Sequence, residues 1–442
     1  MPTSYLPYDP QQQMLLPHAL QEWLPEGHLA YYISDTVDEL DLSAFHARYG
    51  GGGPRNQPFH PAMMVKVLLY AYATGVFSSR KIARKLHEDV AFRVLGAGNF
   101  PKHRTLCDFR ALHLQELAAL FVQVVKLARE CGLVKLGTIA VDGTKVKASA
   151  SRHKAMSYQR MLESEAQLQE QIAALLDKAR ATDTAERNEP ELDIPAEILR
   201  REQRLEVIRA ARARLESRQR ELDAARGRSE DDERTPRDKD GKAKRGPRYK
   251  RAFGVPEEST QENFTDPDSR IMKRAGGGFD QSYNGHTAVD AHAQIIVAAE
   301  LTNNGADSDR LPVLLQAVQD TCGAAPGVVL ADAGFRAEKV FEQLAQHPTE
   351  LVVALGREGR DALKIDPKRY PHTAAMADKL ASREGEAAYR RRKAIVEPPN
   401  GWIKHIIGFR QFSFRGLSKV RAEWKLVCTA LNLRRMGGMG AS

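Results

Sequence analysis

The sequence predicts a mixed α+β or α/β protein with a mixed sheet, an all-helical N-terminal domain and an inserted helical hairpin. Three observations predict this class. Residues 61–132 carry apolar side chains at helical spacing almost throughout. Within 137–147 and 283–355, short β-branched runs are followed by alternating helical and strand patterns, as in layered α/β domains. Residues 152–228 carry leucine and isoleucine at near-heptad spacing among many Arg and Glu residues, which is typical of paired helices.

Length and charge restrict the class of protein further. The 442 residues are enough for two or three domains with a substantial core. The net charge is +9 and the isoelectric point is about 9.3, which favours an anionic partner. A long polyanion such as nucleic acid fits this charge best.

Cysteine usage and hydropathy exclude several classes. Cys107, Cys131, Cys322 and Cys428 are far apart and form no CxxC pair, so neither a zinc knuckle nor a disulfide framework is expected. The sequence has no run of 18 apolar residues, and its start lacks the pattern of a signal peptide. We therefore expect reduced thiols, no membrane, and a cytoplasmic protein that associates with the nucleoid when it binds DNA.

Breaks in composition divide the chain. Residues 50–54 are four glycines and a proline, which mark a boundary. Residues 229–250 are almost wholly charged and cannot bury a core, so they should be disordered when free. We expect a loop-rich start (1–60), a helical DNA-binding domain (61–132), a catalytic domain in two pieces (133–151 and 265–436), the inserted hairpin (152–228) and a charged, disordered linker (229–264).

The helical domain carries basic residues on its outward positions. In the helix expected after Ser79, Ile82 and Leu86 should face inward, while its four basic residues face out. Short helices, tight turns and outward basic residues resemble a helix-turn-helix DNA reader. A helical packing domain with solvated charges fits the pattern equally well. The candidate DNA contacts in this domain are Arg80, Lys81, Arg84, Lys85, Lys102, Arg104 and Arg110.

The remaining elements follow in order. A long amphipathic helix is expected at 112–132, before the strand near 137. After the insertion, helices are expected at 311–322, 338–346, 389–408 and 420–436, and strands at 283–291, 295–301, 327–331 and 351–355. Residues 357–387 look irregular or weakly helical.

The stretch at 137–147 organises the catalytic domain. Ile139 and Val141 bracket a small residue and predict a buried strand, with Asp142 at its end. A carboxylate there is costly to bury unless it is paired or holds a metal ion. Asp332, which closes the apolar run before it, and Glu397, in a basic helical run, could join Asp142 in space.

Three acids suit phosphodiester chemistry. Transfer of a phosphodiester needs an activated hydroxyl and stabilised charge on two oxygens, which two Mg²⁺ ions about 3.5–4 Å apart supply. Mg²⁺ prefers oxygen ligands and keeps several waters, so a few carboxylates suffice. We expect Asp142 to bridge both ions, and Asp332 and Glu397 each to complete one. Mn²⁺ is the expected substitute for Mg²⁺.

Basic residues flank these acids. Lys393 and Lys404 lie four residues before and seven after Glu397, on one helical face if the helix continues. Such cations could contact phosphates while the acids hold metal. The candidate DNA contacts of the catalytic domain are Lys145, Lys147, Tyr389, Arg392, Lys393 and Lys404.

Simpler interpretations exist for each residue. An Asp at the end of a strand usually forms a turn or caps a helix, and Glu397 could simply pair with Lys393 on the surface. Rival acids also lie nearby in the chain, and the scattered histidines lack metal-ligand spacing. The rival acids are Asp266, Asp268 and Asp307, and the histidines are His60, His87, His103 and His286.

Several motifs, in order, resemble a bacterial insertion-sequence transposase of the DDE type, most closely the insertion sequence 1182 family. The resemblance covers most of the chain. Its N-terminal parts are Tyr8-Asp-Pro-Gln-Gln-Gln, the block from His60 to Tyr72, and Ser79-Arg-Lys-Ile-Ala. Its catalytic parts are Val141-Asp-Gly-Thr-Lys, Thr265-Asp-Pro-Asp-Ser-Arg, Tyr283-Asn-Gly-His, Ala331-Asp-Ala-Gly-Phe, Val396-Glu with Lys404, and Phe414-Arg-Gly-Leu.

The resemblance implies a ribonuclease-H-like catalytic domain that holds Mg²⁺ on Asp142, Asp332 and Glu397. It implies cleavage at the ends of the element, strand transfer into target DNA, and a homodimer assembled on terminal inverted repeats and target DNA. One feature departs from the related signature of Tyr, two residues, Arg, three residues, Glu, six residues, Lys. Here four residues separate Arg392 from Glu397.

Two other functions are compatible with parts of the sequence. A DNA-binding regulator, or a catalytically inactive domesticated transposase, needs the basic helical domain and the positive charge but no acids. A glycosidase would use paired carboxylates, but the few aromatic residues near the acids and their basic surroundings argue against it.

Overall fold

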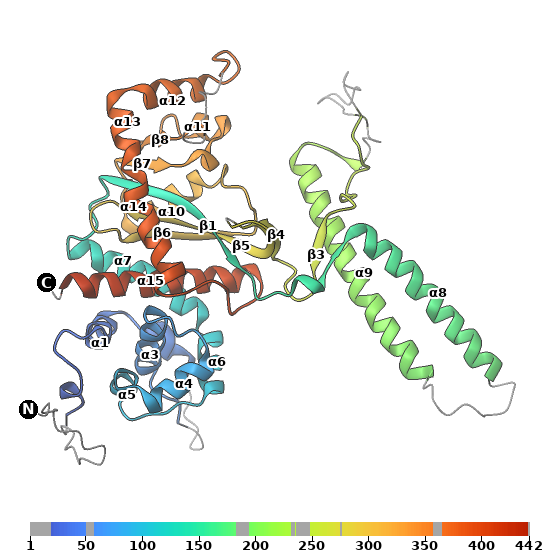
Figure 1. Ribbon diagram of the computed structural model, residues 1–442, viewed down its shortest axis with the longest axis horizontal. Coiled ribbons are helices and arrows are strands. Elements are labelled where there is room, and N and C mark those ends of the chain that lie inside the picture. The colour runs from blue at the N-terminus through green and yellow to red at the C-terminus, as the bar shows by residue number, and fades with distance from the viewer. Residues whose placement is uncertain are drawn as a thin grey trace, which may run out of the picture.

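The computed structural model describes residues 19–49, 57–182, 194–230, 235, 248–274, 276–356 and 365–440 (Figure 1). Its first part is a layer of helices. Residues 19–49 are mainly helical, where the sequence predicts a loop-rich segment, and the expected breaker at 50–54 lies outside the described residues. The helices of this layer are α1 (Leu29–Glu39), α2 (Ser43–His46), α3 (Pro61–Ala73), α4 (Ser79–Glu88), α5 (Val90–Gly96), α6 (His103–Leu112) and α7 (Leu114–Glu130).

Local sequence explains these helices. Pro61 takes the first position of α3, where its missing N–H costs nothing. The Asp89 carboxylate accepts from the backbone N–H of Ala91 and so caps α5. Helix α3 is buried on nearly every side because other helices surround it.

A mixed sheet forms the centre of the second part. Its strands are β1 (Thr138–Lys147), β4 (Arg270–Lys273), β5 (Phe279–Asp290), β6 (Ile296–Thr302), β7 (Val328–Ala331) and β8 (Glu350–Val353). The strand order is β4-β5-β1-β7-β8, and β6 also pairs with β5. Strand β5 runs antiparallel to β1, β4 and β6, whereas β1, β7 and β8 are parallel. This mixed α+β arrangement is consistent with a ribonuclease-H-like fold.

Helices cover the sheet. They are α10 (Leu311–Cys322), α11 (Glu338–Gln343), α12 (Pro371–Ala381), α13 (Arg383–Arg390), α14 (Arg392–Gly401), a π-helical turn η6 (Trp402–Ile406) and α15 (Leu417–Gly440). Helices α12 and α13 are regular where the sequence predicts an irregular or weakly helical segment at 357–387, of which 357–364 lie outside the described residues. Helix α14 packs on β1 and β5.

Helix α15 joins the two parts. It packs against α3, α7 and β6, and in Figure 1 it lies between α3 below it and the sheet above it. One continuous apolar cluster therefore runs from the N-terminal helices into the sheet, with the fully buried Trp424 of α15 inside it. The helical and sheet parts share one core.

The inserted segment leaves the body of the protein as a long arm (Figure 1). Two helices, α8 (Tyr158–Thr182) and α9 (Ile194–Ala225), pack on each other, and a small sheet of β2 (Ala155–Ser157) and β3 (Gln261–Asn263) lies at their base. Strand β3 belongs to a segment predicted to be disordered. It is ordered because the buried carboxylate of Glu262 pairs with Arg214 and Arg218 of α9. Residues 231–234 and 236–247 lie outside the described residues.

No single helix among the described residues is long and apolar enough to cross a membrane. Helices α6 and α7, bent by 69° at their junction, meet the length and composition criteria only as a pair.

Candidate active site

Asp142 lies in the middle of β1, and the prediction that it ends a strand is wrong. Strand β1 pairs with the parallel strand β7 only as far as Ala140. It continues to Lys147 because it pairs with β5 along its whole remaining length, with Asp142 opposite Thr287. Asp142 therefore lies two residues beyond the point where β1 stops pairing with β7.

Asp332 lies beside Asp142. It follows β7 directly, and the parallel register that pairs Ala140 with Leu330 brings the next polar positions of both strands to one edge. Burial raises the pKa of Asp142, and the nearby carboxylate of Asp332 raises it further. The Asp332 Oδ1 also accepts a hydrogen bond of 2.9 Å from the Gly334 N–H, so Asp332 caps a short 3₁₀ turn as well.

Helix α14 reaches Asp142 through a residue that the sequence analysis missed. The Asn400 Nδ2 donates to Asp142 Oδ2 at 3.0 Å, and the Thr287 hydroxyl donates to Asn400 Oδ1 at 3.3 Å. Asn400 is buried, and with Arg392 and Val396 it forms a stripe at four-residue spacing. That spacing was a usable signal, because two polar residues on an otherwise apolar stripe suggest a polar partner in the sheet.

Glu397 lies on the same helix but outside this stripe, and its side chain is exposed. Among the described residues, Glu397 makes no hydrogen bond with Asp142 or Asp332. Lys404, on the following turn, is half-buried; burial lowers its pKa and the Asp142 carboxylate opposes that shift.

Arg392 contributes a positive charge beside Asp142. Its side chain is only 8% exposed, and its Nε and Nη1 groups have no hydrogen-bond partner within the described residues. The guanidinium lowers the pKa of Asp142, against the effect of burial. Unpartnered buried N–H groups are costly, so this pair of donors suits an anionic ligand such as a phosphate.

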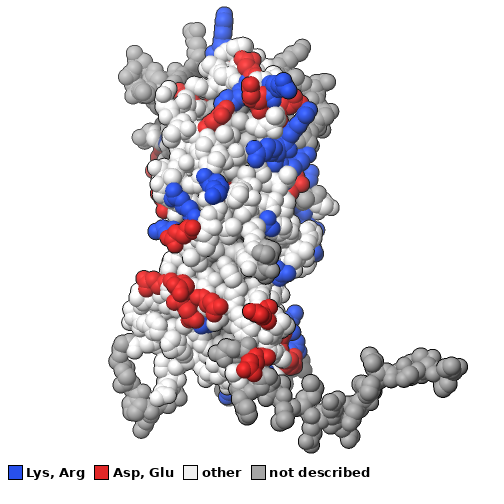
Figure 2. All heavy atoms as spheres, turned by 90° about the vertical axis from the view of Figure 1, so that its left-hand side faces the viewer, with Lys and Arg blue, Asp and Glu red and all other residues white. Residues whose placement is uncertain are grey.

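The other expected DNA contacts have different surroundings. The structure corrects the prediction that Arg110 contacts DNA. Its side chain is buried, and its guanidinium donates to the Tyr72 hydroxyl and the Phe77 carbonyl. The exposed residues are Arg80, Lys81, Arg84, Lys102, Arg104, Lys147 and Lys393, and the half-buried ones are Lys85, Lys145, Tyr389 and Lys404. Figure 2 shows that the positive charge is unevenly spread, since acidic side chains gather on the lower part of one face.

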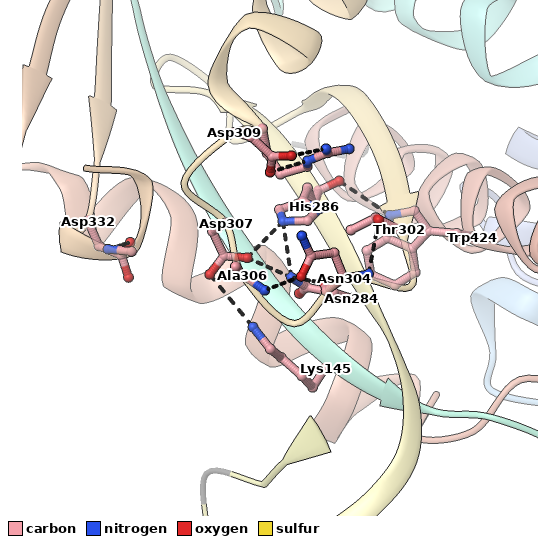
Figure 3. A network of polar contacts seen from close by, with 12 residues as sticks. Lys145, Asn284, His286, Thr302, Asn304, Ala306, Asp307, Asp309, Asp332 and Trp424 are labelled. Atoms are coloured by element: carbon pink, nitrogen blue, oxygen red, sulfur yellow. Dashed lines mark hydrogen bonds and ion pairs between the residues drawn. The ribbon is translucent and has the colours of Figure 1, made fainter. Parts of the chain in front are cut away.

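The rival acids divide into two groups. Asp266 is fully buried and accepts from the Tyr283 hydroxyl and the Gly416 N–H, while Asp268 accepts from the Leu417 N–H. Both therefore hold loops together. Asp307 lies nearer to the site, where buried residues of β5 face it (Figure 3).

Two hydrogen bonds fix one oxygen of the Asp307 carboxylate. Its Oδ1 accepts from His286 Nε2 at 2.8 Å and from Asn284 Nδ2 at 2.6 Å, and its Oδ2 lies 3.6 Å from Lys145 Nζ. Burial would raise the pKa of Asp307, but these two hydrogen bonds and Lys145 lower it below the usual value. His286 lacks metal-ligand spacing in the sequence and was therefore not expected at the site. The usable signal was its place among the polar residues Asn284 and Thr287 of one strand.

No group of three or more His, Cys, Asp or Glu side chains converges on a metal position within the described ranges. Asp142 and Asp332 still fit Mg²⁺, which is commonly held by one or two carboxylates together with water and substrate phosphates. The two carboxylates therefore supply the oxygen ligands that Mg²⁺ prefers and leave its other coordination positions for water and substrate phosphates.

Comparison with known families gives two matches. Residues 240–433 match the family described as transposase DDE domain, and residues 18–112 match the family described as transposase domain (DUF772). The two matches support a DDE-type insertion-sequence transposase. No curated protein and no solved structure matches the chain significantly.

The matches cover the transposase unevenly. The DDE match includes Asp332, Glu397 and all of α14, but it begins after β1 and so excludes Asp142. The inclusion of Asp142 in the candidate site therefore depends on its position beside Asp332 and on its hydrogen bond to Asn400. The DUF772 match covers α1 to α6. A DDE domain indicates a nuclease or phosphoryl-transfer enzyme that acts on DNA with divalent metal.

Asn400 should matter to the transposase without contacting DNA itself. We expect Asn400→Leu to lower the rate of DNA cleavage by roughly 10- to 100-fold, because the Asp142 carboxylate loses the group that orients it. Cleavage of a labelled element end measures this. Asn400→Gln should recover part of the rate, and equal rates for Asn400→Leu and wild type would show that the hydrogen bond has no role.

Proposed function

We propose that this protein is a transposase that binds the ends of an insertion sequence, cleaves the DNA with a divalent metal ion and joins the freed 3′-hydroxyl to target DNA. The observation that carries the proposal is the pair of carboxylates, Asp142 and Asp332, at neighbouring strands of a mixed sheet beside Arg392, whose Nε and Nη1 groups have no hydrogen-bond partner within the described residues. A phosphodiester is a ligand that both the acids, through a metal ion, and the guanidinium would bind.

The residues have separate roles in this proposal. Asp142, Asp332 and Glu397 would hold Mg²⁺, or Mn²⁺ in its place, and the ion when bound would stabilise the charge on the attacking and leaving oxygens. Arg392 would bind a non-bridging phosphate oxygen. Lys404 and Lys145, which lie near Asp142, would contact the DNA backbone on either side.

Glu397 requires a change when DNA binds. Its side chain is exposed on α14, the helix that reaches Asp142 through Asn400. We infer that Glu397 completes the site only with DNA present. Helix α14 contains Pro398 and Pro399 and continues into a π-helical turn, so its backbone hydrogen bonding is already interrupted next to Glu397.

The test is cleavage of labelled DNA that carries the source element's own end, with Mg²⁺ and with EDTA. We expect nicking that depends on metal and is lost in Glu397→Gln, while the variant still binds the end. Glu386→Gln is the matched control, because it makes the same change at an exposed side chain of α13 that pairs with Arg390, and it should keep most of the cleavage.

The result also separates the alternative function. Specific binding of the end without metal-dependent nicking by wild type would favour a DNA-binding regulator or an inactive domesticated transposase. The exposed position of Glu397 is the observation that favours this alternative function.

Finer features belong to the same proposal. The ordered motifs favour the insertion sequence 1182 family, and the outward basic residues of α4 favour a helix-turn-helix mode of binding to terminal inverted repeats. We propose that the protein works as a homodimer on DNA, because two element ends must be brought together. Its place would be the cytoplasm, at the nucleoid when it is bound to DNA.

A further inference from the structure

A fourth acid lies at the candidate site and is held there by buried side chains. Asp307 follows β6 in a loop, and it approaches the site between two glycines (Figure 3). A Cβ atom on Gly143 would lie 2.7 Å from the Asp307 Oδ1, and a Cβ atom on Gly334 would lie 3.1 Å from its Oδ2. Any larger residue at either position would displace the carboxylate.

Gly143 and Gly334 connect Asp307 to the two aspartates of the candidate site. Gly143 follows Asp142 directly, and the Gly334 N–H donates to Asp332 Oδ1. The position that a Cβ atom would take on Gly334 is 3.0 Å from Asp332 Oδ1 as well as 3.1 Å from Asp307 Oδ2. The two carboxylate oxygens therefore flank one small open position.

The inner side of Asp307 is fixed. His286 and Asn284 are both fully buried in β5, and both donate to the same oxygen, Oδ1. Hydrogen bonds of this kind orient the carboxylates that bind metal ions in proteins. The outer oxygen, Oδ2, accepts no hydrogen bond from the described residues, since the Lys145 Nζ lies 3.6 Å away, which is longer than a hydrogen bond.

An unpartnered polar atom lies beside the same carboxylate, on its Oδ1 side. Asn284 Oδ1 is buried without a hydrogen-bond partner in the described part of the chain, and it lies 3.3 Å from the position of a Cβ atom on Gly143. The space beside Gly143 thus carries the Asp307 carboxylate and a free amide oxygen, which are both ligands that hard divalent cations prefer.

We propose that Asp307 is a metal ligand of the site, and that its Oδ2 binds, together with Asp332, one of the divalent ions that the proposed transposase uses. This inference rests on the proposed function. It adds a fourth acid, from the loop after β6, to the three that the sequence analysis assigned. His286 and Asn284 are positioning residues for Asp307.

Binding of Mn²⁺ to the purified full-length protein, measured by electron paramagnetic resonance without DNA, tests the proposal. We expect Asp307→Asn to weaken Mn²⁺ binding by roughly 10- to 100-fold. Asp309→Asn is the matched control, since it removes the same charge two residues away from an exposed side chain that pairs with Arg310. Its affinity should stay within about twofold of wild type, as screened exposed charges have little effect.

A second variant separates direct binding from a general effect of charge. Asp307→Cys places a thiolate at the same position, and with Co²⁺ it should give a thiolate-to-cobalt absorption band that wild type lacks. Wild type, whose Cys107 and Cys131 are exposed, is the reference for any background band. Thermal melting without metal should show that both variants are folded.

The outcomes distinguish the two proposals. If wild type binds Mn²⁺, Asp307→Asn binds it equally well and Asp307→Cys gives no band, Asp307 is not a ligand, while the proposed function stands. If wild type binds no Mn²⁺ and does not cleave DNA, the proposed function fails and the assignment of Asp307 fails with it.

Discussion

Asp142→Asn should abolish metal-dependent DNA cleavage while the fold and the binding of the element end persist. The change keeps the size of the side chain but removes a charge that lies beside Asp332 and Arg392. A metal ion stabilises the transition state of phosphoryl transfer by several kcal/mol, so we expect a rate loss of at least about 10³-fold. Single-turnover cleavage of labelled DNA measures the loss.

The control for this variant is another aspartate. Asp320 is exposed on α10, where it accepts from Gln316, and Asp320→Asn should cleave at the wild-type rate. Asp332→Asn should behave as Asp142→Asn does. Cleavage by Asp142→Asn within tenfold of wild type would remove Asp142 from the site and would direct attention to the acids inside the region that matches the DDE family.

Glu423→Leu should destabilise the protein by about 3–5 kcal/mol, because it removes one partner of a buried charged network. Glu423 is fully buried on α15. The Tyr72 hydroxyl donates to its Oε1 at 3.1 Å and itself accepts from the buried Arg110 at 3.0 Å. The backbone N–H groups of Ser413 and Phe414 donate to its Oε2. The substitution leaves the Arg110 charge in the core without its counter-charge.

Equilibrium unfolding in urea measures the effect. Glu300→Ala is the matched control, because Glu300 pairs with Lys425 of the same helix at a partly exposed site, and its loss should cost less than about 1 kcal/mol. The double variant Arg110→Leu/Glu423→Leu should lose less than the two single variants together, since it removes both charges. A loss below 1 kcal/mol for Glu423→Leu would mean that water or movement of α15 compensates.

Periodicity predicted much of the fold. The helix expected at 311–322 is α10 with the same bounds, and the strand expected at 327–331 differs from β7 by one residue. These elements have apolar faces that a single window of sequence reveals. The end of β1 was missed because its last residues are polar or basic, and they are extended only through their pairing with β5, which lies far along the chain.

The site was predictable where an acid follows an apolar run, as Asp332 does after β7. The site was not predictable where a buried polar residue contacts one of the acids. The spacing of Asn400 on α14 and the polar neighbours of His286 in β5 indicate a polar contact but not its partner, because only the packing of α14 and β5 brings these residues to the acids. Arg110 shows the converse: a basic residue in a basic segment was expected on the surface and is buried.

The shared core also determines when the N-terminal helices can complete their folding during synthesis on the ribosome. Helix α3 buries much of its surface against α15, which begins at Leu417, so about 340 residues must be made after α3 before its last neighbour exists. At about 5–20 residues per second, the wait is roughly 20–70 s. Until then the apolar surface of α3 faces water or a chaperone. A chain that stops before α15 therefore leaves the N-terminal helical layer incomplete.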